Sequence, residues 1–202
     1  NQRGSCWINA ALQGVFRIPD LQHRFREGDE DSHNTVEVCL SEVFGSKGEE
    51  GLKELYQCVK TATMPAGEDI GDSHELIEFL CDKVPFLDKL MRFKVGHKIK
   101  CDHCKYNETR EDSLIEFPIV PSKPKQTVLD AIVDAVTPFP IADWTCETCF
   151  GMGCTKQFLV GSFPQVLVFH MTSVSSSVSY TAQLVVNGNK YALFAIVCFN
   201  GG

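Results

Sequence analysis

Cys101-Asp-His-Cys104 and Cys146-Glu-Thr-Cys149 are two cysteine pairs with the same two-residue gap. This gap lets both sulfurs of a pair turn onto one metal ion, and two such pairs make a tetrahedral four-cysteine zinc site of the ribbon type. The stretch between the pairs is longer than a compact zinc finger needs. We therefore expect a structural Zn²⁺ that joins distant segments of a larger fold, with disulfides or free thiols as the alternatives.

The composition is that of a soluble globular protein. The chain has 202 residues, of which 44% are hydrophobic and 22% charged, enough to bury a core as one or two domains. No apolar run reaches the roughly 20 residues that span a bilayer, so we expect no membrane association. The net charge of −7 argues against a nucleic-acid partner.

The remaining cysteines favour a reducing compartment. Among the ten cysteines, Cys39, Cys58 and Cys81 lie in helix-like apolar patterns, where a reduced cysteine behaves as a small hydrophobic residue. A secreted scaffold held by disulfides would be smaller than this chain. We expect the protein in the cytosol or the nucleus.

Helical patterns dominate the first part of the chain and strand patterns the last. Apolar periodicity predicts helices over residues 10–16, 35–60 with a break at 45–51, 72–82 and 128–136. A buried strand is predicted over 166–169, and a hairpin over 184–186 and 191–199 around Asn187-Gly188. We expect residues 166–169 and 191–197 to share one sheet, with the helix that follows Cys6 packed beside it.

Cys6 comes directly before the first helical stripe, which places it at a helix N-terminus. The helix dipole and the free backbone N–H groups there stabilise a thiolate, which is the form of cysteine that attacks carbonyl carbons. The pattern therefore predicts a nucleophile. A buried cysteine that merely begins a helix is the alternative interpretation.

Five motifs occur in an order that indicates one family. They are Asn1-Gln-Arg-Gly-Ser-Cys6-Trp-Ile-Asn-Ala-Ala-Leu-Gln13, Asp72-Ser-His-Glu-Leu-Ile-Glu-Phe-Leu-Cys-Asp82, the two cysteine pairs, Phe163-Pro-Gln-Val-Leu-Val-Phe-His170 and Tyr191-Ala-Leu-Phe-Ala-Ile-Val197. Together they resemble the ubiquitin-specific proteases, the papain-like cysteine deubiquitinases. Each motif alone is weak, but the ordered set spans nearly the whole chain.

The resemblance implies a fold and an activity. The fold is α+β, a papain-like right hand within a single catalytic domain: a helical thumb over residues 1–93, zinc-ribbon β fingers over 94–157 and an incomplete β palm over 158–202. The implied activity is that of a cysteine-type isopeptidase. It would remove ubiquitin, or a ubiquitin-like modifier, from its protein conjugates.

The resemblance also implies roles for individual residues. Cys6 matches the nucleophile, and Asn1 matches the asparagine that stabilises the oxyanion, a role that suits an amide N–H₂ group. Asp72 and Glu75 match acidic positions that line the channel for ubiquitin's basic C-terminal tail. Asp72 is also a plausible N-cap of its helix, so a purely structural role is the alternative.

Departures from the family pattern concern the catalytic base. In the family the catalytic histidine follows the strand matched by residues 191–197, in a Gly-His-Tyr motif, and an Asp or Asn comes later. The chain stops at Phe199-Asn-Gly-Gly202. We expect the chain to be cut at both ends, with the histidine beyond residue 202; a natural pseudoenzyme is the alternative.

Other departures concern the substrate. Trp7 replaces the usual Tyr or Phe, and Met-Thr-Ser-Val replaces Leu-Lys-Arg-Phe after His170. A SUMO-directed relative of the family also has Cys-Trp at its nucleophile, which makes SUMO a second candidate modifier. A binding module for ubiquitin or SUMO without catalysis, and a zinc-ribbon interaction scaffold, are the alternative functions.

Overall fold

The computed structural model describes residues 6–27, 34–45, 48–63, 71–121, 123, 125–171 and 178–198. The chain forms two compact units, which are described separately below. The described residues of 1–90 and 193–202 form the first unit, and those of 91–192 form the second. No helix within these described ranges is both long enough and apolar enough to cross a membrane.

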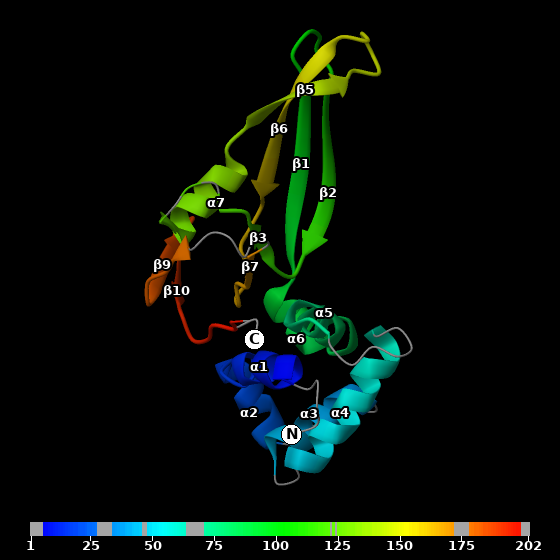
Figure 1. Ribbon diagram of the computed structural model, residues 1–202, viewed down its shortest axis with the longest axis vertical. Coiled ribbons are helices and arrows are strands. Elements are labelled where there is room, and N and C mark those ends of the chain that lie inside the picture. The colour runs from blue at the N-terminus through cyan, green and yellow to red at the C-terminus, as the bar shows by residue number, and fades with distance from the viewer. Residues whose placement is uncertain are drawn as a thin grey trace. The chain divides into compact units, whose positions relative to one another are not determined.

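The first unit is built from helices (Figure 1). They are α1 Cys6–Val15, α2 Pro19–Glu27, α3 Thr35–Phe44, α4 Gly48–Thr63, α5 Ser73–Lys83 and α6 Pro85–Met91. The predicted helical segments of this unit correspond to α1, α3, α4 and α5, although Phe16 and Asp72 lie outside the helices and α4 begins at Gly48, inside the predicted break. Sequence analysis did not predict α2 or α6, which begin at Pro19 and Pro85. Proline is well tolerated at the first position of a helix, because the N–H that it lacks has no partner there.

The core of the helical unit lies between the apolar faces of these helices. Ile8 and Leu12 of α1, Leu55 of α4 and Leu76 of α5 are almost completely buried. Each such side chain contributes about 1.5–3 kcal/mol by leaving water. Burial of this face fixes the orientation of α1 and therefore the direction in which its polar residues point.

The main sheet of the second unit has the strand order β2-β1-β6-β5, with all neighbours antiparallel. Its strands are β1 Phe93–Cys101, β2 Asn107–Leu114, β5 Phe139–Thr145 and β6 Met152–Val160. The turns β1–β2 and β5–β6 lie at the same end of this sheet (Figure 1). These turns carry the two cysteine pairs, so the sheet topology brings the pairs together.

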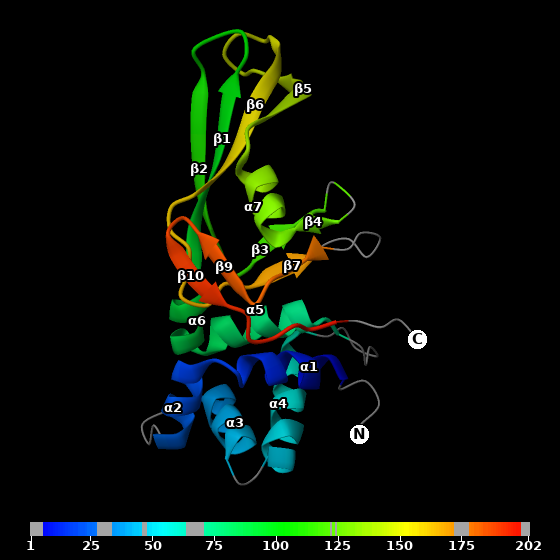
Figure 2. The ribbon, with the colours of Figure 1, turned by 90° about the vertical axis from the view of Figure 1, so that its left-hand side faces the viewer.

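Short elements lie beside and below the other end of this sheet within the second unit (Figure 2). They are β3 Phe117–Ile119, β4 Gln126–Thr127, α7 Val128–Val136, β7 Phe169–Met171, β8 Val178–Ser179, β9 Gln183–Val186 and β10 Asn189–Ala192. β3 pairs with β7 and β4 with β8, both parallel, and β9 forms a hairpin with β10. The α7 helix spans the residues predicted for it.

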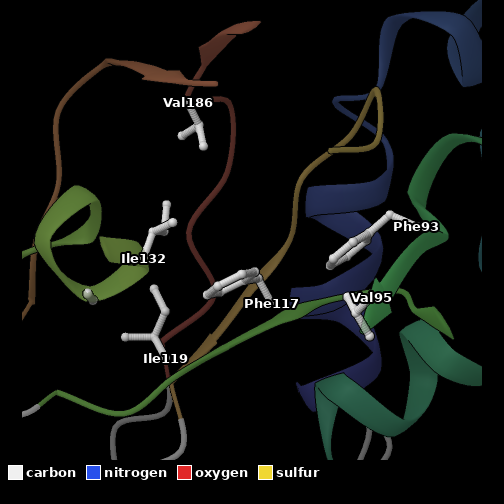
Figure 3. Packing of buried hydrophobic residues seen from close by; sticks show 7 residues of the cluster. Phe93, Val95, Phe117, Ile119, Ile132 and Val186 are labelled. Atoms are coloured by element: carbon white, nitrogen blue, oxygen red, sulfur yellow. The ribbon is translucent and has the colours of Figure 1, made fainter. Parts of the chain in front are cut away.

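A hydrophobic cluster joins these short elements to the main sheet. Phe117 of β3 is fully buried and lies between Ile132 of α7 and Phe93 of β1 (Figure 3). Val186 of the hairpin belongs to the same cluster. Side chains from strands and a helix thus share one core, and the predicted α+β class is confirmed.

Two strand predictions are wrong. Only Phe169 of the predicted strand 166–169 lies in β7, although Val166 is only 7% exposed. The apolar run reflected burial, which a short sequence pattern cannot distinguish from strand pairing. The hairpin turn at Asn187-Gly188 is present, with φ of 48° and 81°, but β10 ends at Ala192. Because β7 and β10 belong to different two-stranded sheets, residues 166–169 and 191–197 do not share one sheet.

Candidate nucleophile and metal centre

Cys6 is the first residue of α1, and its side chain is exposed. The next two residues, Trp7 and Ile8, are buried and anchor the first turn of the helix. The thiol therefore lies at the N-terminal end of the helix, open to solvent, where a substrate can reach it. The alternative of a buried structural cysteine is wrong. Asn1, the predicted oxyanion group, lies outside the described residues.

The N-terminus of α5 carries the two predicted acidic residues. Asp72 is the N-cap, and its carboxylate accepts a hydrogen bond from the N–H of His74 at 3.0 Å. Glu75 completes a capping box by accepting from the N–H of Asp72 at 3.4 Å. The predicted capping role of Asp72 is therefore real. Both side chains are exposed, so their carboxylates also remain available to a positively charged ligand.

The first turns of α1 and α5 are joined directly. The hydroxyl of Ser73 donates a hydrogen bond to the carbonyl of Trp7 at 3.0 Å. This bond connects the residue after Cys6 to the residue after Asp72. The structure thus brings the candidate nucleophile and the candidate acidic residues onto neighbouring helix ends.

The segment that follows β10 lies along α1 (Figure 2). A Cβ atom placed on Gly14 would be 3.5 Å from Cβ of Ala195 and 4.0 Å from Cγ2 of Val197. Ala195 and Val197 therefore pack against α1, but they lie in no strand, so the prediction that this helix packs beside a sheet formed with residues 191–197 is wrong.

The four predicted metal ligands form one cluster. The sulfurs of Cys101 and Cys149 are 3.7 Å apart, as are those of Cys104 and Cys146, and all four lie within 4.8 Å of one another. A tetrahedron of sulfurs about 2.3 Å from a zinc ion has edges of about 3.8 Å. A disulfide would require about 2.05 Å. None of the ten cysteines, all of which are described, forms a disulfide, so the disulfide alternative is wrong and the cluster suits a metal ion.

Backbone N–H groups donate hydrogen bonds to sulfurs of this cluster. The N–H of His103 donates to the sulfur of Cys101 at 3.3 Å, and that of Tyr106 to Cys104 at 3.4 Å. Loss of solvent opposes ionisation of Cys146, but the N–H groups of Cys149 and Thr148 help to lower its pKa to about 6.

The four thiols do not ionise equally. The N–H of Tyr106 favours the thiolate of Cys104, but loss of solvent and hydrogen bonds with the other three thiols raise its pKa to about 12. Four adjacent thiolates repel one another, and a divalent cation that prefers sulfur ligands removes this conflict. The chemistry of the donor set thus fits the geometry.

Two nearby residues support the cluster without belonging to it. His103, inside the first pair, has its Nε2 atom 2.7 Å from the carbonyl of Met152, which connects the two metal-binding turns. Cys154 is buried and faces Cys101 across the β1–β6 ladder. Sequence analysis assigned neither role, since both depend on strand register that has no local signature.

The α+β fold, the exposed Cys6 thiol at a helix N-terminus and the four-cysteine cluster together define a class of protein. It is the class that the motifs predicted. A comparison with family profiles narrows this class: the profile described as ubiquitin carboxyl-terminal hydrolase matches residues 1–202. The chain belongs to this family. Among curated proteins, none matches the chain.

Several solved structures of similar fold come from the SAGA DUB module. The chain is similar to Ubp8/Sgf11/Sus1/Sgf73 bound to monoubiquitin, with a TM-score of 0.69 and 14% identity over 91% of this chain and 52% of that chain. It is also similar to a yeast SAGA DUB module with an Sgf73 mutant, with a TM-score of 0.71 and 14% identity over 91% of this chain and 51% of that chain. These likenesses confirm the predicted fold. The chain spans about half the length of these structural neighbours.

Proposed function

We propose that this chain is the catalytic domain of a cysteine-type isopeptidase that releases ubiquitin or a ubiquitin-like modifier from conjugates. The observation that carries the proposal is the exposed Cys6 thiol at the N-terminus of α1, in a chain whose full length matches the family profile. In this proposal residues 1–93 act as thumb, 94–157 as fingers and 158–202 as palm.

The proposed reaction begins at the Cys6 sulfur. The thiolate attacks the carbonyl carbon of the modifier's C-terminal glycine, the bond to the target's lysine nitrogen breaks, and the amine leaves with a proton. Water then hydrolyses the thioester to a carboxylate and regenerates the thiol. Asn1 would stabilise the oxyanion. We assign no catalytic base among the described residues.

The proposed ligand of Asp72 and Glu75 is the basic C-terminal tail of the modifier. Both carboxylates are exposed at the end of α5 that is hydrogen-bonded to the first turn of α1. A tail held there would lead its last residue toward Cys6. Two of the structural neighbours hold monoubiquitin and ubiquitin aldehyde, which supports ubiquitin as the modifier, with SUMO as the alternative.

The proposed metal is one structural zinc ion held by the four clustered cysteines. Four protein ligands leave no open coordination position, so the ion would hold two turns of the sheet together rather than take part in the reaction. Ten free cysteines support a reducing compartment, the cytosol or the nucleus, as the location.

Labelling with an electrophilic probe tests this function. Ubiquitin and SUMO that carry an electrophile at the C-terminus are incubated with the chain, and adducts are located by mass spectrometry. We expect a ubiquitin adduct on Cys6 that is absent from Cys6→Ala and unchanged in Cys198→Ala, since Cys198 is the matched exposed cysteine of the same unit. Labelling by SUMO alone would reassign the modifier. Tight binding without labelling would favour a binding module.

A further inference from the structure

The first turns of α1 and α5 also meet through a close contact between Trp7 and Gly71. A Cβ atom placed on Gly71 would lie 2.7 Å, 2.9 Å and 3.0 Å from the indole atoms Cζ2, Cη2 and Cε2 of Trp7. The two shorter distances are ones that real Cβ atoms essentially never show, so any larger residue at position 71 would displace this ring. The backbone at Gly71 therefore rests directly on the indole.

This contact has a second, independent support in the same place. The Ser73 hydroxyl is bonded to the Trp7 carbonyl, so the Trp7 ring contacts the residue before Asp72 and the Trp7 backbone holds the residue after it. Two points of attachment on either side of Asp72 restrict both the distance and the rotation of the α5 N-terminus relative to α1. Cys6 is the neighbour of Trp7 in the chain.

The geometry points to Trp7 and Gly71 as positioning residues: their contact sets how far the Cys6 thiol lies from the carboxylates of Asp72 and Glu75. This inference rests on the proposed function and deepens it, because that distance determines where the end of a bound modifier tail falls relative to the nucleophile. A displacement of about 1 Å in a reacting group can cost on the order of 100-fold in rate.

Ordinary core packing does not account for the choice of tryptophan. Trp7 is 6% exposed, and its buried Nε1–H group has no hydrogen-bond partner among the described residues. Burial of an unpaired N–H group lowers stability, and phenylalanine would avoid this cost. The atoms that touch Gly71 belong to the six-membered ring of the indole, which extends beyond the reach of a phenylalanine ring.

The test compares Gly71→Ala, Trp7→Phe and the double variant. Three quantities are measured: the rate of Cys6 labelling by the electrophilic ubiquitin probe, the rate of its alkylation by iodoacetamide, and the thermal midpoint of unfolding. Iodoacetamide needs only a reactive thiol. The probe also needs the modifier's C-terminal tail to be bound so that its last residue lies at the Cys6 sulfur. Gly161→Ala is the matched control, since a Cβ there would meet only the carbonyl of Lys94 at 3.9 Å.

We expect Gly71→Ala to slow probe labelling by about 10-fold or more and to change alkylation by less than about 2-fold. Trp7→Phe makes room for the new methyl group, so the double variant should recover to within about 3-fold of wild type, a coupling typical of residues in contact. If Gly71→Ala does not fold, the Trp7→Phe variant tests the inference. Its smaller ring makes a looser contact with Gly71, so probe labelling of Cys6 should slow more than alkylation by iodoacetamide.

Three outcomes would overturn the inference. The first is that Gly71→Ala slows probe labelling and alkylation equally, and the second is that it does not change the rate of probe labelling. The third is that the double variant is labelled by the probe no faster than the slower single variant. A wild-type chain that reacts with iodoacetamide but with neither modifier probe would contradict the proposed function itself, and the inference with it. A labelled wild type with an equally labelled Gly71→Ala contradicts the inference alone.

Discussion

Asp72 shows how one side chain can stabilise a helix and also be available to a ligand. Its carboxylate accepts the hydrogen bond that caps α5, and the same carboxylate is exposed next to the helix that begins with Cys6. The capping function needs only a short side chain with an acceptor oxygen. Recognition of a basic tail needs the negative charge as well.

Substitution at Asp72 separates these two roles. Asp72→Asn keeps the acceptor, so we expect the free energy of unfolding to change by less than about 0.5 kcal/mol, whereas Asp72→Ala should cost about 1 kcal/mol. Both variants lose the charge and should slow labelling by the ubiquitin probe several-fold. Urea unfolding and probe kinetics measure the two effects. Normal labelling of Asp72→Asn would show that the charge serves no substrate.

The α7 helix shows how a short element is held at its first turn. Thr127 is the N-cap, and its hydroxyl accepts from the N–H of Asp130 at 3.0 Å, while Asp130 accepts from the N–H of Thr127 at 3.1 Å. The hydrogen bonds from the Thr127 hydroxyl and N–H lower the pKa of the Asp130 carboxyl. The opposite face of α7 contributes Ala131 and Ile132 to the hydrophobic cluster.

Removal of this cap should destabilise the protein in a pH-dependent way. Thr127→Ala is expected to cost about 1 kcal/mol at neutral pH, and Thr127→Ser, which keeps the hydroxyl, less than half of that. Because the folded-state pKa of Asp130 is lowered, its contribution is present above the ordinary carboxyl range and is lost as the pH falls through the folded-state value. The difference between the thermal midpoints of wild type and Thr127→Ala should therefore become smaller in acid, while the part due to the hydrogen bond from the Asp130 N–H to the Thr127 hydroxyl remains. A constant difference would mean that Asp130 does not take part.

At the scale of the whole molecule, the proposed metal ion would replace part of the core that a thin sheet cannot build. The outer end of the four-stranded sheet has few buried residues, and Phe150 and Met152 beside the second cysteine pair are 78% and 63% exposed. Hydrophobic burial therefore cannot hold the turns β1–β2 and β5–β6 together. Four sulfurs on one ion can, because metal binding contributes directly to folding.

We expect one zinc ion per purified chain, measured by elemental analysis. Cys146→Ser should lose the ion and lower the thermal midpoint. Cys154→Ser is the matched control, since Cys154 is equally buried but lies outside the cluster, and it should retain the ion. Chelation at low pH should also release the ion, because protonated thiols do not bind it. A folded chain without metal would disprove this prediction.

Features that depend on a few neighbouring residues could be predicted from the sequence. Apolar periodicity and caps indicated the limits of α7 and the helix that begins at Cys6. Residues that favour a left-handed backbone indicated the turn at Asn187-Gly188, and ligand spacing indicated the two cysteine pairs. The order of the five motifs along the chain indicated the family, and the profile match confirmed it.

Features that depend on where distant segments meet required the tertiary structure. Val166-Leu167-Val168 is apolar yet lies outside β7, because the ladder with β3 begins only at Phe169, and the place of β3 depends on the packing of distant segments. The fit of Gly71 against Trp7 has no local signature either, since any turn before a helix tolerates glycine. Chain geometry over a few residues follows from the residues themselves, but contacts between helix ends follow only from the packing of the whole unit.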